Sequence, residues 1–256
     1  MIQSVDRAVR ILTVLQGGRR MSLGEIATAL RLPPSTVHGI VRTLLAHGMV
    51  QQERDSLRYR LGPATLRLGN VYLDTLELRA RVATWAEQLA RYTGYAVRTG
   101  VLLFGDVVVV HHEPRPDGTR QMPEVGIVIP AHACALGKAL LAYDADAADL
   151  VLSGELRSMT AETLTTTAGL RSALAEVRAS GIAAEAEEAV LGEFGVAAPL
   201  AEAGGSVAGA IGLVVPGGDW PVEPATIDAL RAAARTVSRE LGAQTWPPVA
   251  DTSSAA

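Results

Sequence analysis

The feature that most constrains the fold of this chain is a pair of short amphipathic helices separated by two adjacent prolines. Ser22 and Glu25 have the spacing of a capping box, in which a hydroxyl and a carboxylate satisfy backbone donors at the start of a helix. Pro33-Pro34 ends that helix, because proline removes a donor and restricts the residue before it. The second helix is predicted to begin near Ser35, with apolar residues at helical spacing: Val37, Ile40, Val41, Leu44 and Leu45. Together these elements predict a helix-turn-helix.

The outward face of the second helix is small and polar. It carries Ser35, Thr36, His38, Gly39, Arg42 and Thr43. Hydroxyl, imidazole and guanidinium groups reach base edges and phosphates when such a helix lies in the major groove of DNA. Glycine inside a helix costs roughly 1 kcal/mol relative to alanine. Gly39 therefore indicates either that the backbone approaches something closely or that the helix is locally loose, and the sequence does not decide between them.

A β-hairpin is predicted next, with strands over 49–53 and 57–61 and a turn at 54–56. Two short strands behind a recognition helix form a wing, whose arginines suit contact with phosphates or the minor groove. The residues predicted to bind double-stranded DNA are Ser35, Thr36, His38, Arg42, Arg54 and Arg58. The competing interpretation is a small helical domain that binds protein.

Charge is distributed unevenly along the chain. Residues 1–62 hold nine arginines and four acidic residues, a net +5, whereas the whole chain carries −4, so the remainder carries −9. A basic segment joined to an acidic one indicates that the first segment meets a polyanion. A locally basic, solvated surface is the competing interpretation.

Composition excludes several classes of protein. Cys134 is the only cysteine, so an intrachain disulfide is excluded and no cysteine cluster is available for a structural zinc. Apolar runs are much shorter than the ~20 residues that span a bilayer. Residues 1–6 lack the charged and apolar regions of a signal peptide. We therefore expect a soluble, cytoplasmic protein that does not contact the membrane.

Beyond the hairpin, the pattern predicts a different architecture. Helical spacing is found over 64–75, 77–92, 135–143, 145–152, 170–180 and 224–241, and strand-like segments over 96–103, 107–112, 125–129, 182–187, 194–201 and 206–215. This order indicates an antiparallel sheet covered by helices, so the fold class is α+β. The predicted division is a winged helix-turn-helix at 1–62, a linker helix at 63–76, a second domain at 77–243 and a disordered tail at 244–256.

Three stretches of sequence resemble the IclR family of bacterial regulators. Residues 4–12, SVDRAVRIL, resemble the first helix of that family. Residues 130–139, PAHACALGKA, resemble its central sensing motif, and 185–188, EAEE, with 209–212, GAIG, resemble a third motif. The resemblance covers essentially the whole chain. It implies a GAF- or profilin-like, effector-binding second domain in a transcriptional regulator, expected to be a repressor, that binds a palindromic operator as a homodimer or homotetramer.

Further stretches resemble actinobacterial regulators of glycerol catabolism within that family. They lie at 36–44, 72–74, 77–81, 111–112 and 115–117. This resemblance implies control by a signal derived from glycerol. The expected effector is a small anionic metabolite, with glycerol 3-phosphate as the first candidate. An effector from aromatic or other carbon-source catabolism is the alternative.

The predicted effector site lies at the start of a helix that follows a bend at Pro130. Backbone N–H groups that open this helix are able to hold an oxyanion. The resemblance adds Glu185, which stands where the family has an aspartate. Glu185 is expected to face a ligand hydroxyl. It also adds Gly195, which stands where the family has a side chain in its ligand pocket. The missing side chain is expected to leave room for a larger ligand. The residues predicted to bind the effector are Cys134, Ala135, Leu136, Gly137, Glu185 and Gly195.

Other chemistry is weighed at the same place. Cys134 takes the N-cap position of a common Ser or Thr, and sulfur accepts hydrogen bonds weakly, so a poorer cap is expected. A thiol–imidazole pair with His132 lacks a third, orienting group. His111, His112 and His132 match no standard zinc site. Lys138 is expected to neutralise an anion or to lie on the solvated surface. We expect no catalytic residue, metal or cofactor, and a sensor or enzyme built on a GAF-like domain is the remote alternative.

Overall fold

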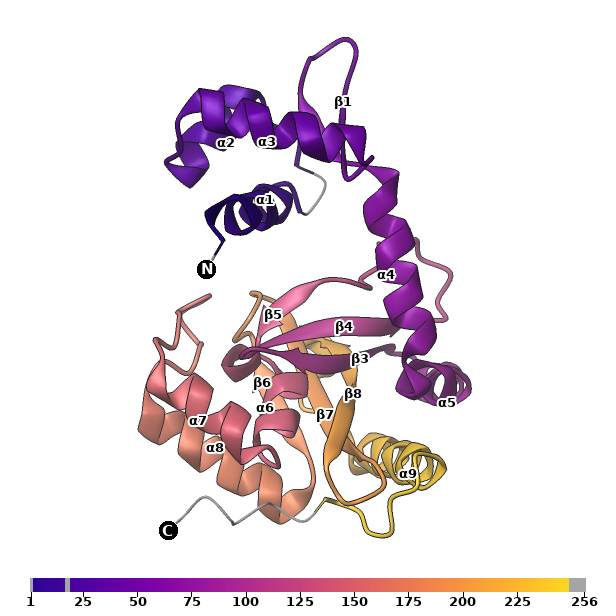
Figure 1. Ribbon diagram of the computed structural model, residues 1–256. Helices are drawn as coiled ribbons and strands as arrows, with labels where there is room; N and C mark the ends of the chain where they lie inside the picture. The colour runs from indigo at the N-terminus through magenta and orange to yellow at the C-terminus, as the bar shows by residue number, and fades with distance from the viewer. Residues whose placement is uncertain (1, 17–18, 249–256) are drawn as a thin grey trace. The chain divides into compact units, whose positions relative to one another are not determined.

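The computed structural model describes residues 2–16 and 19–248. The chain divides into two compact units, residues 1–75 and 76–256, each with its own hydrophobic core (Figure 1). The boundary follows the helix that the sequence analysis treated as a linker, and this helix belongs to the first unit by its contacts.

The first unit contains the expected helix-turn-helix and wing. Its elements are α1 (Gln3–Val14), α2 (Leu23–Leu30), α3 (Pro34–Ala46), β1 (Val50–Gln52), β2 (Tyr59–Leu61) and α4 (Pro63–Thr75). The capping box forms: Glu25 N donates to Ser22 Oγ at 3.2 Å, and Ser22 N donates to Glu25 Oε2 at 2.7 Å. Pro34 occupies the first turn of α3, where a backbone N–H would have no hydrogen-bond partner within the helix, so its absence costs no hydrogen bond.

The strands of the wing are shorter than predicted. Leu57 adopts a left-handed φ of 53°, and its N–H donates to the Glu53 carbonyl at 3.1 Å, so residues 53–58 form a turn. The wing is also tied to the body of its unit, because Met21 and Tyr59 exchange backbone hydrogen bonds of 3.0 and 2.7 Å. The pairing of Met21 with the hairpin is non-local, and nothing in the sequence pattern indicates it.

The second unit is an antiparallel sheet covered by helices, as expected. Its strands are β3 (Ala96–Leu103), β4 (Asp106–Glu113), β5 (Val128–Pro130), β6 (Ala183–Ala186), β7 (Glu193–Ala201) and β8 (Val207–Pro216). They pair in the order β5-β4-β3-β8-β7-β6. The predicted third strand over 125–129 begins only at Val128, because Gly126 lies in a turn with a φ of 90°.

Two helical layers sandwich this sheet (Figure 1). One core lies between the sheet and α5 (Glu77–Thr93) with α9 (Pro224–Glu240). The other lies between the sheet and α6 (Ala135–Leu141), α7 (Ala145–Ser153) and α8 (Thr167–Ser180). Among the described residues, no helix is long and apolar enough to cross a membrane.

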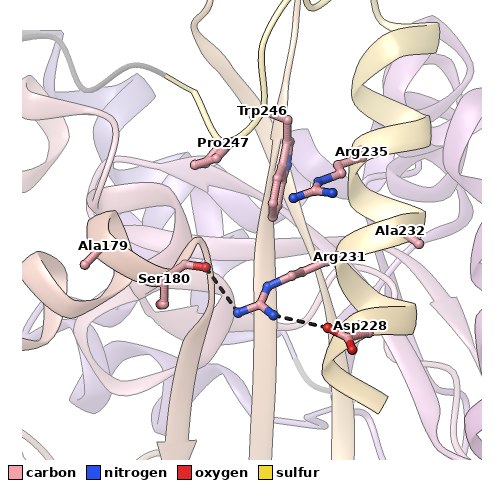
Figure 2. Close-up of a pocket in the computed structure, with 8 residues that line it drawn as sticks. All are labelled: Ala179, Ser180, Asp228, Arg231, Ala232, Arg235, Trp246 and Pro247. Carbon is pink, nitrogen blue, oxygen red and sulfur yellow. Dashed lines mark hydrogen bonds and ion pairs between the residues drawn. The ribbon is translucent and has the colours of Figure 1, made fainter. Parts of the chain in front are cut away.

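The start of the predicted disordered tail is packed against the fold, which corrects that prediction for residues 244–248. Trp246 Nε1 donates to the carbonyl of Pro199 on β7 at 2.8 Å. The Arg235 guanidinium lies 5.2 Å from the centroid of the indole ring. The indole lines a cavity of about 460 Å³. Beside it, Arg231 bonds to Asp228 and to the Ser180 carbonyl (Figure 2). The rest of the predicted tail, 249–256, lies outside the described residues.

Candidate DNA interface and effector site

The outward face of α3 presents the residues predicted to read DNA. Val37, Val41 and Leu44 are buried in the core of the first unit, and this fixes the rotation of the helix. Ser35, His38 and Arg42 consequently face solvent together, whereas Thr36 is half-buried at the edge of this face. Their exposure follows the helical period.

The two wing arginines differ in their surroundings. Arg54 is exposed in the turn between β1 and β2. Arg58 instead donates to Glu25 Oε2 at 2.9 Å and to the Arg20 carbonyl at 2.8 Å. The hydrogen bonds of Ser22, followed by those of Arg58, hold the pKa of Glu25 below its usual value. Arg58 thus joins the wing to the start of α2, and its contact with phosphate stays a prediction that must compete with this pair.

The start of α6 is a closed, internally bonded structure. Cys134 is the N-cap, and its Sγ accepts a hydrogen bond from Gly137 N at 3.3 Å, so sulfur does cap this helix. Burial raises the pKa of the Cys134 thiol, which keeps it protonated and unreactive. The imidazole of His132 bonds to the Arg157 carbonyl at 3.0 Å. The thiol–imidazole pair considered from the sequence is therefore not organised as a nucleophile and base.

Packing, rather than ligand space, explains the small and apolar residues of α6. A Cβ at Gly137 would lie 2.0 Å from the carbonyl oxygen of Ala131, so only glycine lets the preceding turn (131–133) pack on the helix. The side chain of Leu136 packs against two glycines of the sheet. A Cβ at Gly212 would lie 3.2 Å from one of its methyl groups, and a Cβ at Gly100 would lie 3.4 Å from the other. Ala135 and Leu136 are both buried. Their side chains hold α6 against the sheet.

Glu185 occupies the space that Gly195 was expected to leave for a ligand. The two residues are cross-strand partners on β6 and β7. A Cβ at Gly195 would lie 3.0 Å from Glu185 Oε1, so the absence of a side chain there accommodates the carboxyl of Glu185 itself. The expectation of free room at Gly195 is thus corrected, because the longer acid of this chain folds over the glycine.

The carboxyl of Glu185 is buried and lies at the start of α6. Burial raises its pKa to about 8, the negative charges of Glu193 and Glu188 add to the rise, and Lys138 with the Ala135 backbone N–H opposes it. Its Oε2 makes no hydrogen bond within the described part of the chain. The raised pKa favours the neutral, protonated form of this carboxyl, which lies beside the amide of Ala135.

The charges that act on Glu185 include members of one buried and one partly buried ion pair, and the sequence pattern indicates neither pair. Lys138 Nζ donates to Glu188 Oε1 at 2.7 Å, so the only lysine of the chain is neither solvated nor free to neutralise an anion. Arg98 on β3 binds Glu193 at 2.5 Å and also pairs with Glu124. Burial would lower the pKa of Arg98, but its hydrogen bonds to these carboxylates outweigh burial and raise it. Both pairs join residues far apart in sequence.

The histidines weighed as zinc ligands are not brought together. His111 and His112 are neighbours on β4, so their side chains project from opposite faces of the strand. Burial lowers the pKa of both imidazoles. Within residues 2–16 and 19–248, no group of three or more His, Cys, Asp or Glu side chains is arranged to hold a metal ion.

Known families and proteins match both units of this chain. The IclR helix-turn-helix domain matches residues 4–54, and the C-terminal domain of the bacterial transcriptional regulator IclR matches residues 70–239. The glycerol operon regulatory protein of Streptomyces griseus is 43% identical over 252 residues, covering 94% of this chain and 97% of that protein. The protein of the same name from Streptomyces coelicolor is 42% identical over 249 residues, with 94% and 97% covered.

Solved structures agree with the fold. An IclR transcriptional regulator from Alicyclobacillus acidocaldarius superposes with a TM-score of 0.79 at 27% identity, covering 93% of this chain and 98% of that one. An IclR homologue from Microbacterium hydrocarbonoxydans, in complex with 4-hydroxybenzoate, gives 0.77 at 25% identity, covering 93% and 99%. The named relatives of both Streptomyces species are regulators of transcription, not enzymes. This chain belongs to the IclR family of bacterial transcriptional regulators.

Proposed function

We propose that this regulator represses a glycerol catabolic operon and leaves its operator when a glycerol-derived metabolite binds the second unit. The observation that carries the proposal is the 42–43% identity, over 94% of the chain, to two glycerol operon regulatory proteins. Because the target is chromosomal DNA, the protein acts in the cytoplasm.

The DNA contact is assigned to the exposed face of α3. Ser35, His38 and Arg42 point to solvent together from a helix whose other side is buried. Side chains of these types bond to base edges in the major groove. Arg54 at the tip of the wing adds a phosphate contact, and Thr36 and Arg58 are secondary candidates.

A second copy of the chain is proposed to cover the apolar surface of α1 and α4. Three apolar residues recur at helical spacing from the N-cap of α1 to its middle, and each is more than half exposed: Ile2, Val5 and Val9. α4 has no buried residue, and it exposes Leu66, Leu68, Val71 and Tyr72. Apolar residues gathered in this way indicate an interaction surface. A homodimer, or a homotetramer built from two dimers, then binds a palindromic operator with two half-sites.

This dimer surface is tested by adding a charge to it. Val71→Asp is expected to convert the protein to monomer at micromolar concentration, because a carboxylate cannot be buried unpaired in an apolar contact. Val190→Asp, an exposed valine in the second unit, is the matched control and should leave the assembly unchanged. Sedimentation velocity distinguishes the two. A wild-type protein that is monomeric yet binds operator normally would contradict the assignment.

The effector site is proposed at the start of α6, with glycerol 3-phosphate as the first ligand to test. Its phosphate would take the amides of Ala135 and Leu136, while Glu185 would turn to a ligand hydroxyl. What supports this is the raised pKa of Glu185, since a carboxyl in its neutral form does not repel an incoming phosphate. Cys134, Gly137 and Gly195 shape the same place.

The experiment titrates the full chain on promoter DNA with glycerol, glycerol 3-phosphate and 4-hydroxybenzoate, following thermal stability and release of DNA. Glycerol 3-phosphate is expected to raise the unfolding midpoint and to release the DNA. The aromatic acid represents the alternative effector class, which the complex of the Microbacterium homologue favours. If only the aromatic acid acts, the glycerol assignment fails while the regulator remains.

A further inference from the structure

Gly39 lies on the side of α3 that points away from the core of its unit. At about 100° per residue, it lies roughly 160° around the helix from both Val37 and Val41. Those two side chains are buried. Ser35 precedes Gly39 by four positions and Arg42 follows it by three, so Gly39 lies at the centre of the exposed face.

Within the described chain, no contact accounts for a glycine at this position. A Cβ on Gly39 would meet no atom within 4 Å, in contrast to Gly137, where it would overlap backbone. Gly39 does not have a left-handed φ either. Glycine is less favourable than alanine in a helix interior, so its presence on an open helix face lowers stability for no internal gain.

The backbone of α3 is regular at Gly39. The helix runs without interruption from Pro34 to Ala46. The hydroxyl of Thr43, one turn further along, donates to the Gly39 carbonyl at 3.2 Å. Of the two explanations that the sequence left open, this regular geometry favours close approach of the backbone to another molecule.

A recognition helix fits the major groove closely. The groove is about 12 Å wide, and a helix with its side chains is about 10–12 Å across. The side chain at the centre of the inserted face therefore sets how deeply the helix enters. A methyl group there holds the helix off the base pairs, and hydrogen bonds from flanking side chains weaken steeply as they lengthen.

We propose that Gly39 lets the backbone of α3 approach the base edges of the operator, so that it is a positioning residue that sets specificity. Its neighbours Ser35, His38 and Arg42 then reach the bases at bonding distance. This inference rests on the proposed role of α3 in DNA binding.

The test uses the full chain and a duplex that the wild-type protein enriches from a random-sequence pool. Gly39→Ala is expected to weaken binding to this duplex by about 5- to 50-fold, within the range of a lost base contact. Gly39→Leu should weaken it further. Binding to an unrelated duplex, and its dependence on salt, should change by less than about twofold, because phosphate contacts are not made by the centre of the face. The midpoint of thermal unfolding should stay the same or rise.

Gly24→Ala is the matched control. Gly24 is also exposed in a helix with no atom within 4 Å of a Cβ, but it lies in the first turn of α2. This variant should keep wild-type affinity for the enriched duplex and the wild-type sedimentation coefficient. The loss in Gly39→Ala would then be due to its place on α3 rather than to helix stiffness.

Arg42→Ala separates the failure of this inference from that of the proposed function. If Arg42→Ala loses affinity for the enriched duplex while Gly39→Ala and Gly39→Leu keep it, close approach at Gly39 is overturned and the recognition helix stands. If all three variants bind as the wild type does, α3 is not the reading helix and both proposals are overturned. An equal loss of specific and unrelated binding in Gly39→Ala would also overturn the inference.

Discussion

The exposed face of α3 and the buried start of α6 differ in how far their polar groups are already satisfied. Ser35, His38 and Arg42 project into solvent. At α6, the thiol of Cys134 caps the helix, and Lys138 is bound to Glu188 in a buried pair. The two regions are each assigned a ligand, yet only the first presents a face that is open to one.

This difference teaches that the two binding events have different structural requirements. If DNA binds the exposed face of α3 as proposed, it meets a face that is already open. An effector bound at the start of α6 as proposed would have to displace Glu185 from the space over Gly195, so its binding would be coupled to a change within the second unit. A ligand shifts a conformational equilibrium only by its differential affinity for the two states, and displacement of Glu185 provides such a difference.

The strongest test of the closed region removes one partner of its buried ion pair. Lys138→Met is expected to lower the free energy of unfolding by about 3–5 kcal/mol, because it leaves the carboxylate of Glu188 buried without its partner. Replacing both residues, as Lys138→Met with Glu188→Leu, should recover most of the loss. Urea unfolding measures both variants. A loss below about 1 kcal/mol in the single variant would show that the start of α6 is not held together by this pair.

The second test uses the titration of Glu185. Its pKa is raised from 4.5 to about 8 in the folded state, so the folded protein binds more protons than the unfolded chain between these values. The free energy of unfolding should therefore fall as pH rises from about 4.5 to about 8, by an amount on the order of a few kcal/mol. Glu185→Gln should remove this part of the decline, whereas Glu176→Gln, at an exposed position of α8, should not. Identical pH profiles for wild type and Glu185→Gln would refute the buried carboxyl.

A third test addresses the open region. Arg42→Ala is expected to weaken operator binding by about 1–3 kcal/mol if the guanidinium reads a base. Because Arg42 is exposed, its removal should leave thermal stability unchanged. Arg171→Ala, an exposed arginine of α8, is the control in the same fluorescence-anisotropy titration. A loss of stability in Arg42→Ala would indicate that the Arg42 side chain is bonded within the protein and is not open to DNA.

The smallest effect is expected at Arg58, whose side chain is partly exposed and already bonded to Glu25. Arg58→Ala should weaken binding to all DNA sequences alike and reduce the salt slope by about one unit. The solvent-exposed pair with Glu25 should contribute little to stability, because water and salt screen it. A salt slope equal to that of the wild type would mean that Glu25 retains Arg58 when DNA binds, leaving Arg54 as the phosphate contact of the wing.

Local signals explain why the helix-turn-helix could be predicted from the sequence. The Ser22–Glu25 capping box, the adjacent prolines and the apolar spacing of α3 are each contained within a few residues. The wing was predicted less well, because its strand ends depend on the left-handed Leu57 and on the pairing of Tyr59 with Met21. The antiparallel sheet was also predictable from alternating apolar runs and tight turns.

The details of the candidate effector site could not be predicted, because they depend on contacts between distant residues. Lys138 and Glu188 are 50 positions apart, and Trp246 reaches a carbonyl 47 positions away. The position of the Glu185 carboxyl over Gly195 depends on the register between β6 and β7, which no local sequence pattern predicts. By contrast, the exposure of Arg42 follows from helical periodicity alone.

The cross-strand fit of Glu185 and Gly195 has an evolutionary consequence. A side chain at position 195 would meet the Glu185 carboxyl at 3.0 Å, so the volume available at one position depends on the residue at the other. Homologous sequences should therefore covary at this pair, with a glycine accompanying the longer acid and a larger residue accompanying a shorter one. Descendants that acquire a new effector would then have to pass through paired substitutions, which makes this position a slow step in the divergence of ligand preference.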